Sequence, residues 1–332
     1  MKQDRPEDPI DRREFLIRSA KAGLLVAATG SLAWLLHAPA GPASPSAAQA
    51  PAFVIPDYSV AGAAKKMAIV QGQNRVETVN LGLKALGGIE TFIKKGDRVL
   101  IKVNAAFATP PILSATTNPE LLSEVVRLCL ASGAASVAVV DNPINNPESC
   151  FALTGIGQAA RTSGARLVLP KEPLFAEITV PGAKLIKSWP VLAGPLGEAN
   201  KLIGIAPVKD HNRSGASMSL KNWYGLVGGR RNMFHQDIHT FIMELAMMIK
   251  PTLVILDGIF SMMTNGPTGG SLSDLKQTNT MIVSTDHVAA DACGAALLGK
   301  SIGDLPYIGK APAAGAGTDD FESLSPVRVT AA

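Results

Sequence analysis

Residues 201–229 read KLIGIAPVKDHNRSGASMSLKNWYGLVGG and join two segments of opposite character. The apolar run LIGIAPV is continuous rather than alternating, which is typical of a strand buried on both faces of a parallel sheet. Charged and amide side chains follow at once, beginning with Lys209, and a glycine-rich segment ends the stretch. Two interpretations fit this polar exit: a solvated loop, or one wall of a binding site.

The rest of the chain repeats this succession of apolar strands and helices. Strands are predicted at 97–104, 136–141, 165–170, 201–207, 252–259 and 280–285, and helices at 74–93, 116–133, 148–164, 232–250 and 286–299. This alternation predicts an α/β fold with a mostly parallel sheet flanked by helices on both faces. A small hairpin insertion is expected around 171–197, where the pattern alternates and contains proline and glycine. We expect 67–299 to form a single α/β domain, 51–66 a loose linker and 300–332 an irregular C-terminal tail.

The first 50 residues have the organisation of an export signal. DRREFLI (11–17) matches the twin-arginine pattern, and an uncharged apolar segment follows at 22–36. Ala48-Gln49-Ala50 is typical of a cleavage site, so we expect cleavage after Ala50, a periplasmic protein, and the twin-arginine translocase as a partner. The alternative is an uncleaved membrane anchor, although a bilayer span normally needs about 20 residues.

The composition argues against several classes of protein. The chain is 47% hydrophobic and 17% charged, which is globular, and its formal charge is only +4. No basic cluster is interleaved with aromatic residues, so nucleic acid is not an expected partner. Cys129, Cys150 and Cys293 are far apart in the sequence, so no iron–sulfur cluster is expected from this chain's own cysteines.

Polar side chains follow five of the predicted strands. They are Asn104, Asp141, Lys209 with His211, Asp257, and Asp286. Ligands of open α/β sheets bind in the crevice at the carboxyl ends of the strands, so a shared site is predicted there. The plainer interpretation is that every strand exits into a polar loop, and Asp286 is also explained as a helix cap.

These residue types suggest roles at such a site. His211, Lys209 and Asp257 are the predicted catalytic residues, with His211 as an acid, a base or a ligand. Asn104, Arg213, Lys221 and Asn222 are predicted to bind substrate, because cations and amides hold carboxylate or phosphate groups. A divalent metal is a further candidate, with His211, His235, Asp257 and Asp286 as its ligands. HQDIH (235–239) lacks the glutamate of the HExxH zinc motif, so His235 and His239 do not define such a site alone.

Taken in order, these motifs resemble a known family. They are Lys102-x-Asn104, TTNPE (116–120), SVAVVD (136–141), Lys209-x-His211, LKNWYGLVGG (220–229), His235, LVILDGI (253–259), NGP (265–267) and STDHVAAD (284–291). The order is similar to that of DUF362, a bacterial and archaeal family of unknown function. The resemblance implies that Asn104, Lys209, His211, Lys221, Asn222, Asp257, Asp286 and Asp291 occupy motif positions. Some relatives carry a ferredoxin-type domain, whose cysteines this chain lacks.

Two functions remain open at this point. The first is an exported enzyme or ligand-binding protein with a small anionic ligand and a metal as a candidate cofactor. The alternative is a non-catalytic periplasmic accessory or binding module for a redox or metalloprotein partner, suggested by the export route and the ferredoxin-linked relatives. The sequence leaves the reaction and the substrate undefined.

Overall fold

The computed structural model describes residues 11–13, 15–17, 19–21, 53–60 and 64–331. The chain divides into two compact units, Met1–Ala52 and Phe53–Ala332. In the first unit, residues 12–13, 15–17 and 19–21 are helical, while the expected apolar segment and cleavage site lie outside the described residues. Among the described helices, none has both the length and the apolar character needed to cross a membrane.

The second unit is built on a nine-stranded sheet with the order β11-β1-β10-β9-β7-β2-β3-β4, and β8 pairs with β7. The strands are β1 (Met67–Gln71), β2 (Arg98–Lys102), β3 (Ser136–Val140), β4 (Arg166–Val168), β7 (Lys201–His211), β8 (Gly215–Ser217), β9 (Leu253–Met262), β10 (Leu275–Ser284) and β11 (Val327–Thr330). β10 is antiparallel to both of its neighbours, whereas the other strands of the row run in one direction. The sheet is therefore mixed but mostly parallel.

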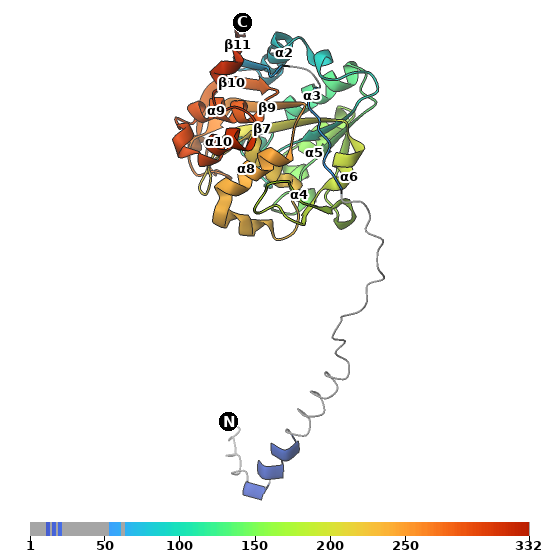
Figure 1. The fold of residues 1–332 in the computed structure, drawn as a ribbon, viewed down its shortest axis with the longest axis vertical. Helices are drawn as coiled ribbons and strands as arrows, with labels where there is room; N and C mark the ends of the chain where they lie inside the picture. The colour runs from blue at the N-terminus through green and yellow to red at the C-terminus, as the bar shows by residue number, and fades with distance from the viewer. Residues whose placement is uncertain (1–10, 14, 18, 22–52, 61–63, 332) are drawn as a thin grey trace, which may run out of the picture. The chain divides into compact units, whose positions relative to one another are not determined.

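Helices cover both faces of this sheet, as the sequence predicted. The helices are α2 (Arg75–Ala85), α3 (Pro119–Ala131), α4 (Pro147–Leu153), α5 (Ile156–Thr162), α6 (Ala193–Glu198), α7 (Ser219–Asn222), α8 (Ile238–Met248), α9 (His287–Leu297) and α10 (Pro306–Lys310). In Figure 1, β7 and β9 lie between α9 and α10 on one side and α3 and α5 on the other. β7 contributes Ile203 and Ile205 to one core cluster and Leu202 and Ala206 to the other, because successive side chains point to opposite faces.

The sequence also predicted the form of three further segments: a hairpin, the C-terminal tail and the linker at 51–66. The predicted hairpin is confirmed as a two-stranded antiparallel sheet of β5 (Ala176–Ile178) and β6 (Trp189–Val191). The expected irregular C-terminal tail instead contains α10 and ends in β11, which pairs in parallel with β1 at the sheet edge. The expected loose linker is also anchored, because Tyr58 is 1% exposed and its hydroxyl donates to the Leu196 carbonyl at 2.8 Å.

β7 continues beyond its predicted end, and this extension positions the site. The strand was expected to stop at 207, but it runs to His211, where the β7–β8 ladder pairs Lys209 with Ser217 and His211 with Gly215. The apolar residues end before the strand does. The last residues of β7 extend past the end of β2, which pairs only with residues 201–204. Lys209 and His211 are therefore held by backbone hydrogen bonds rather than placed on a loose loop.

α7 is fixed against the same strand by one glycine and one carboxylate. A Cβ on Gly204 would lie 2.6 Å from the Trp223 ring, so glycine allows this tryptophan to pack directly on β7. Asp291 of α9 accepts the N–H groups of Ser219 and Leu220 at 2.7 and 3.1 Å, at the start of α7. Lys221 and Asn222 therefore project from a short helix that is held at both ends.

Candidate functional site

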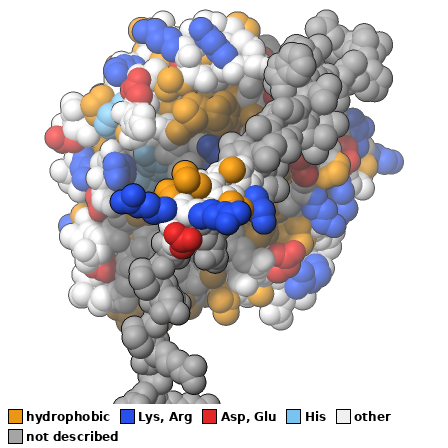
Figure 2. Space-filling view, turned by 90° about the horizontal axis from the view of Figure 1, so that it is seen from below, with side chains coloured by type: hydrophobic (Ala, Val, Ile, Leu, Met, Phe, Trp, Pro, Cys, Tyr) orange, Lys and Arg blue, Asp and Glu red, His pale blue; other side chains and the backbone are white. Residues whose placement is uncertain are grey.

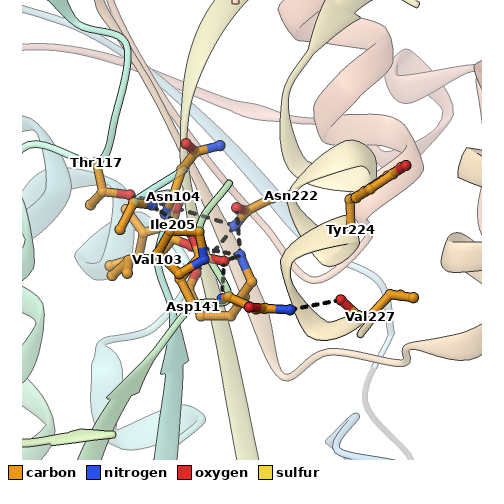
Figure 3. A network of polar contacts seen from close by, with 12 residues as sticks. Val103, Asn104, Thr117, Asp141, Ile205, Asn222, Tyr224 and Val227 are labelled. Atoms are coloured by element: carbon orange, nitrogen blue, oxygen red, sulfur yellow. Dashed lines mark hydrogen bonds and ion pairs between the residues drawn. The ribbon is translucent and has the colours of Figure 1, made fainter. Parts of the chain in front are cut away.

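Lys102, the last residue of β2, is the centre of a buried polar cluster at the carboxyl edge of the sheet. Its Nζ lies 2.8 Å from Oδ1 of Asp141, which follows β3, and donates to Oδ1 of Asn222 at 3.0 Å. The Nδ2 of Asn222 donates back to the carbonyls of Lys102 and Ile205 at 3.2 and 3.3 Å. Figure 3 shows Asp141 and Asn222 in this network, with the hydrogen bonds and ion pairs drawn as dashed lines. The cluster joins β2, β3, β7 and α7.

The carboxylate of Asp141 is fully engaged in this cluster. Besides Lys102, it accepts the backbone N–H of Ala105 at 2.6 Å and that of Asn142 at 2.8 Å. A Cβ on Gly225 would lie 1.9 Å from Oδ1 of Asp141, so the turn after α7 can approach only as glycine. Asn222, which was predicted to bind substrate, instead uses its side-chain amide to link Lys102 of β2 with Ile205 of β7.

Lys209 and Lys221 bring two more ammonium groups to this edge. Lys209 is 1% exposed, and its Nζ donates to the Ala115 carbonyl at 2.5 Å and lies 5.3 Å from the centre of the Phe107 ring. The Nζ of Lys221 lies over the Tyr224 ring, 4.9 Å from its centre, a cation–π arrangement. Within the described part of the chain, neither lysine forms an ion pair with a carboxylate.

Both lysines have a strongly depressed pKa. Burial lowers the pKa of Lys209 to about 7, with a further contribution from the charge of Lys221. Burial likewise lowers the pKa of Lys221 to about 7, and the second cause is the guanidinium of Arg231. Arg231 is held nearby because it donates to the carbonyls of Asn142 and Pro143 at 2.6 and 2.9 Å. An excess of positive charge thus collects in a poorly solvated place, and a bound anion would stabilise it.

His211 and His235 face this cluster with nearly parallel rings, whose centres are 6.2 Å apart and whose planes differ by 16°. Nδ1 of His211 accepts the N–H groups of Arg213 and Ser214 at 3.1 and 3.3 Å. The neutral ring therefore carries its proton on Nε2. Burial, followed by the charges of Lys221 and Lys209, lowers the pKa of His211 to about 2 and keeps it neutral. His211 is thus a hydrogen-bond donor, which argues against its predicted role as a general base or metal ligand.

His235 has the opposite arrangement. Its Nδ1 lies 3.1 Å from the carbonyl of Asn232 and must carry the proton that makes this hydrogen bond, which leaves Nε2 with a free lone pair. Burial is the main cause that lowers the pKa of His235, so this nitrogen is unprotonated near neutral pH. Tyr224 supports the ring, because its hydroxyl lies 3.3 Å from Nδ1. The geometry therefore favours His235 over His211 as the proton acceptor.

The remaining predicted substrate ligands occupy different positions. Asn104 follows β2, and its backbone pairs with Thr117 in both directions. Its side chain extends away from the Lys102 cluster in Figure 3, and its Oδ1 is buried without a hydrogen-bond partner among the described residues, as is Oγ1 of Thr116. Arg213 is exposed, and its charge acts on His235. Asn104 and Thr116 thus offer unused polar atoms, whereas Arg213 lies at the surface.

The structure brings His211 and His235 together but separates Asp257 and Asp286, the other two residues of the predicted metal set, from them. Asp257 lies inside β9, where its Oδ2 pairs with Nε of Arg75 at 2.6 Å, so it is neither a strand-end nor a catalytic residue of this cluster. Asp286 follows β10, which runs antiparallel, and therefore lies at the opposite edge, where it caps α9 through Val288 and Ala289. Within the described residues, no group of three or more histidine, cysteine or acidic side chains is arranged to hold a metal. The predicted set is therefore wrong as a single site.

The roles of three residues were not predicted from the sequence. Lys102 and Asp141 form the buried ion pair, and Tyr224 lies beside both Lys221 and His235. A signal for the first was present, because RVLIKV places a lysine inside an otherwise apolar strand, and a buried lysine needs a partner. Tyr224 gave no comparable signal, since an aromatic residue in a short helical segment is ordinarily part of the core.

The surface is hollowed where such side chains gather. Figure 2 shows a hollow bordered by hydrophobic side chains, with Lys or Arg and His side chains visible in and beside it. A second pocket, of about 360 Å³, lies at the opposite edge and is lined by Arg98, Arg166 and Glu198. There Glu198 accepts Arg166 at 2.5 Å through its carboxylate and Arg98 at 2.5 Å through its carbonyl. In this second pocket Arg166 is paired with a carboxylate and Arg98 is exposed to solvent, so the carboxyl edge, with its buried Lys209, is the better candidate site.

Comparisons with known proteins agree with the order of the motifs. Residues 99–296 match the model of a family described as Domain of unknown function (DUF362). The chain is 27% identical over 227 residues to the thylakoid-associated protein sll1697 of Synechocystis, covering 63% of this chain and 65% of that relative, just under two thirds of its length. The lactate racemase apoprotein of Thermoanaerobacterium thermosaccharolyticum aligns with 73% of this chain and 58% of its own, at 15% identity and a TM-score of 0.40, and this distant likeness carries no functional inference.

Proposed function

The chain belongs to the DUF362 family, and we propose that it binds a small anion, a carboxylate or a phosphate, in the crevice at the carboxyl edge of the sheet. The observation that carries this proposal is the pair Lys209 and Lys221. The Lys209 side chain is buried and that of Lys221 is half-buried, and neither is paired with a carboxylate among the described residues. Buried charges are normally paired, so two compensated only by a carbonyl and a ring favour a ligand that supplies the missing charge.

Neighbouring groups suit the same ligand. The Nε2–H of His211 is a neutral donor, and neutral donors together with ammonium groups are the partners that carboxylate and phosphate oxygens accept. Asp141 is the one carboxylate that influences the pKa of Lys209, and its oxygens are already bound by Lys102, Ala105 and Asn142. Asp141 therefore does not neutralise Lys209 or Lys221, and both ammonium groups remain available to an anion.

The crevice also has a group able to move a proton. Nε2 of His235 is unprotonated, the ring stacks on that of His211, and the charge of Lys221 is close enough to lower the pKa of His235. Proton transfer by a positioned imidazole is among the commonest contributions of histidine to catalysis. We therefore place the protein among ligand-binding proteins that carry acid–base chemistry, with His235 rather than His211 as the proton acceptor.

We further propose that the protein reaches the periplasm through the twin-arginine translocase. The support is the sequence alone: paired Arg12 and Arg13, the apolar segment 22–36 and the small-residue motif at 48–50. Blocking this route in cells should leave the chain uncleaved in the cytoplasm. Export that persists after Arg12→Lys and Arg13→Lys would contradict this assignment.

The binding proposal is tested by calorimetric titration of the full-length protein with acetate and with sulfate. Lys221→Met should abolish or strongly weaken binding, because methionine keeps the apolar contacts of the side chain and removes the charge. Lys84→Met is the matched control, since Lys84 is exposed on α2 and far from the crevice. Absence of binding by the unmodified protein, or equal effects of the two substitutions, would refute the proposal.

A further inference from the structure

The loop that covers Lys209 is unusually apolar for a strand exit. Residues 105–113 read AAFATPPIL, directly after β2. Phe107 lies against the ammonium group of Lys209, and Ala115, two residues past the loop, accepts the hydrogen bond of that group. Ile112 is 65% exposed on the same loop. Loops at the ends of strands are ordinarily polar, so exposed apolar residues at this place need an explanation.

Two neighbouring segments extend the apolar surface. Ile144, in the loop after β3, is 65% exposed, and its N–H donates to the Ala106 carbonyl at 3.0 Å, which joins the two loops. Met233 is 52% exposed on the segment 231–237, and Arg231 at its start binds the carbonyls of Asn142 and Pro143. Ile112, Ile144 and Met233 thus lie on three interlinked segments, and we call them the apolar rim.

We propose that the ligand of this crevice is a small amphiphilic anion, whose charged head is held by Lys209 and Lys221 and whose hydrocarbon part lies along the apolar rim. This inference rests on the proposed anion binding and specifies its ligand class. The two halves of the surface suit such a molecule, because the loop whose Phe107 lies against the Lys209 ammonium group also carries the exposed Ile112 and is hydrogen-bonded to the loop of the exposed Ile144. A compact inorganic anion would satisfy the lysines but would leave the rim exposed.

The test compares straight-chain carboxylates from acetate to octanoate by calorimetric titration of the full-length protein. Removing a methylene from water favours binding about fourfold when burial is complete, so a partly exposed rim should give about twofold for each methylene. Affinity should therefore rise on the order of 50-fold from acetate to octanoate. The combined variant Ile112→Ser, Ile144→Ser and Met233→Ser should lose this dependence and keep the acetate affinity.

Leu153→Ser is the control, because Leu153 is 59% exposed at the end of α4 and lies outside the rim. Equal affinities for acetate and octanoate would overturn the amphiphile and leave the anion site standing, whereas no binding of any chain length would refute the proposed function itself. A chain-length effect that survives in the triple variant would place the hydrocarbon elsewhere and overturn the inference. Flat affinities together with a dimer that the triple variant loses would identify the rim as a protein interface instead.

Discussion

Anion affinity should fall steeply as the pH rises, and the size of this effect follows from the two lysines. In the free crevice, burial and neighbouring positive charge hold the pKa of Lys209 and of Lys221 at about 7. A bound anion stabilises the ammonium form and raises both pKa values. Below this pH the lysines are already charged, and above it the complex forms only by taking up protons, so the affinity is highest on the acidic side.

The magnitude can be worked out for each lysine. If the pKa in the complex stays above the range measured, each lysine weakens binding about 90-fold between about pH 6 and about pH 9. Two lysines acting together would approach the square of that factor. His235 adds little in this range, because its pKa is lowered by burial and its ring stays neutral.

The assay is calorimetric titration with acetate or sulfate at constant ionic strength, since neither anion titrates in this range. Repeating it in buffers of different ionisation enthalpy counts the protons taken up. Lys221→Met should remove the contribution of one lysine, about 90-fold between about pH 6 and about pH 9, from the pH dependence of any residual binding. Lys84→Met should leave the pH dependence unchanged. Affinity that is flat or increases toward alkaline pH would show that the lysines are not the groups that bind the anion.

Two further predictions concern the buried cluster beneath the site, and both are measured by urea unfolding. Lys102→Met leaves the buried Asp141 carboxylate without its cation and should cost about 3–5 kcal/mol. Lys102→Met combined with Asp141→Asn removes the unpaired charge and keeps an oxygen for the backbone N–H groups of Ala105 and Asn142, so it should restore part of this loss. A single substitution no worse than the double one would contradict the ion pair's role. Gly225→Ala places a Cβ 1.9 Å from the Asp141 carboxylate and should cost at least about 1–3 kcal/mol, whereas Gly270→Ala, with nothing within 4 Å, should change stability by less than about 0.5 kcal/mol. Similar losses in the two glycine variants would show that the turn does not depend on this close approach.

The sheet was predictable because burial on both faces leaves a clear record in the sequence. Short apolar runs such as LIGIAPV and TLVIL are typical of interior strands, and helices between such strands favour parallel pairing. No helix is predicted between strands 252–259 and 280–285, so nothing required these two to be parallel, and treating them as parallel caused the error at Asp286. Only the second half of β10, TMIVS, has the apolar character of the parallel strands, and β10 runs the other way, so the residue after it lies at the opposite edge.

Asp257 shows a second feature that the sequence pattern did not predict, a carboxylate inside a strand with a distant partner. The apolar run LVIL was expected to end the strand near this residue, yet β9 continues through GIFSM to Met262. A carboxylate is tolerated inside the strand because Arg75, at the start of α2, reaches it across the face of the sheet. The partner is 182 residues away in the sequence, and no local pattern connects the two. Pairing over such distances is set by packing, which single-sequence periodicity does not contain.

The contrast between Lys102 and Lys221 carries the functional argument furthest. Both lysines lie at the same edge of the sheet, Lys102 buried and Lys221 half-buried, yet only Lys102 has a carboxylate, Asp141, at 2.8 Å. If this edge required only structural stability, an apolar residue in place of Lys221 would serve better, because replacing a buried charge with a packed hydrophobic side chain is often neutral or stabilising. Lys221 instead lies over the ring of Tyr224, which packs beside His235, and the Nε2 atom of His235 is unprotonated. Such an arrangement is costly for the free protein and becomes favourable when an anion enters, as a binding site requires.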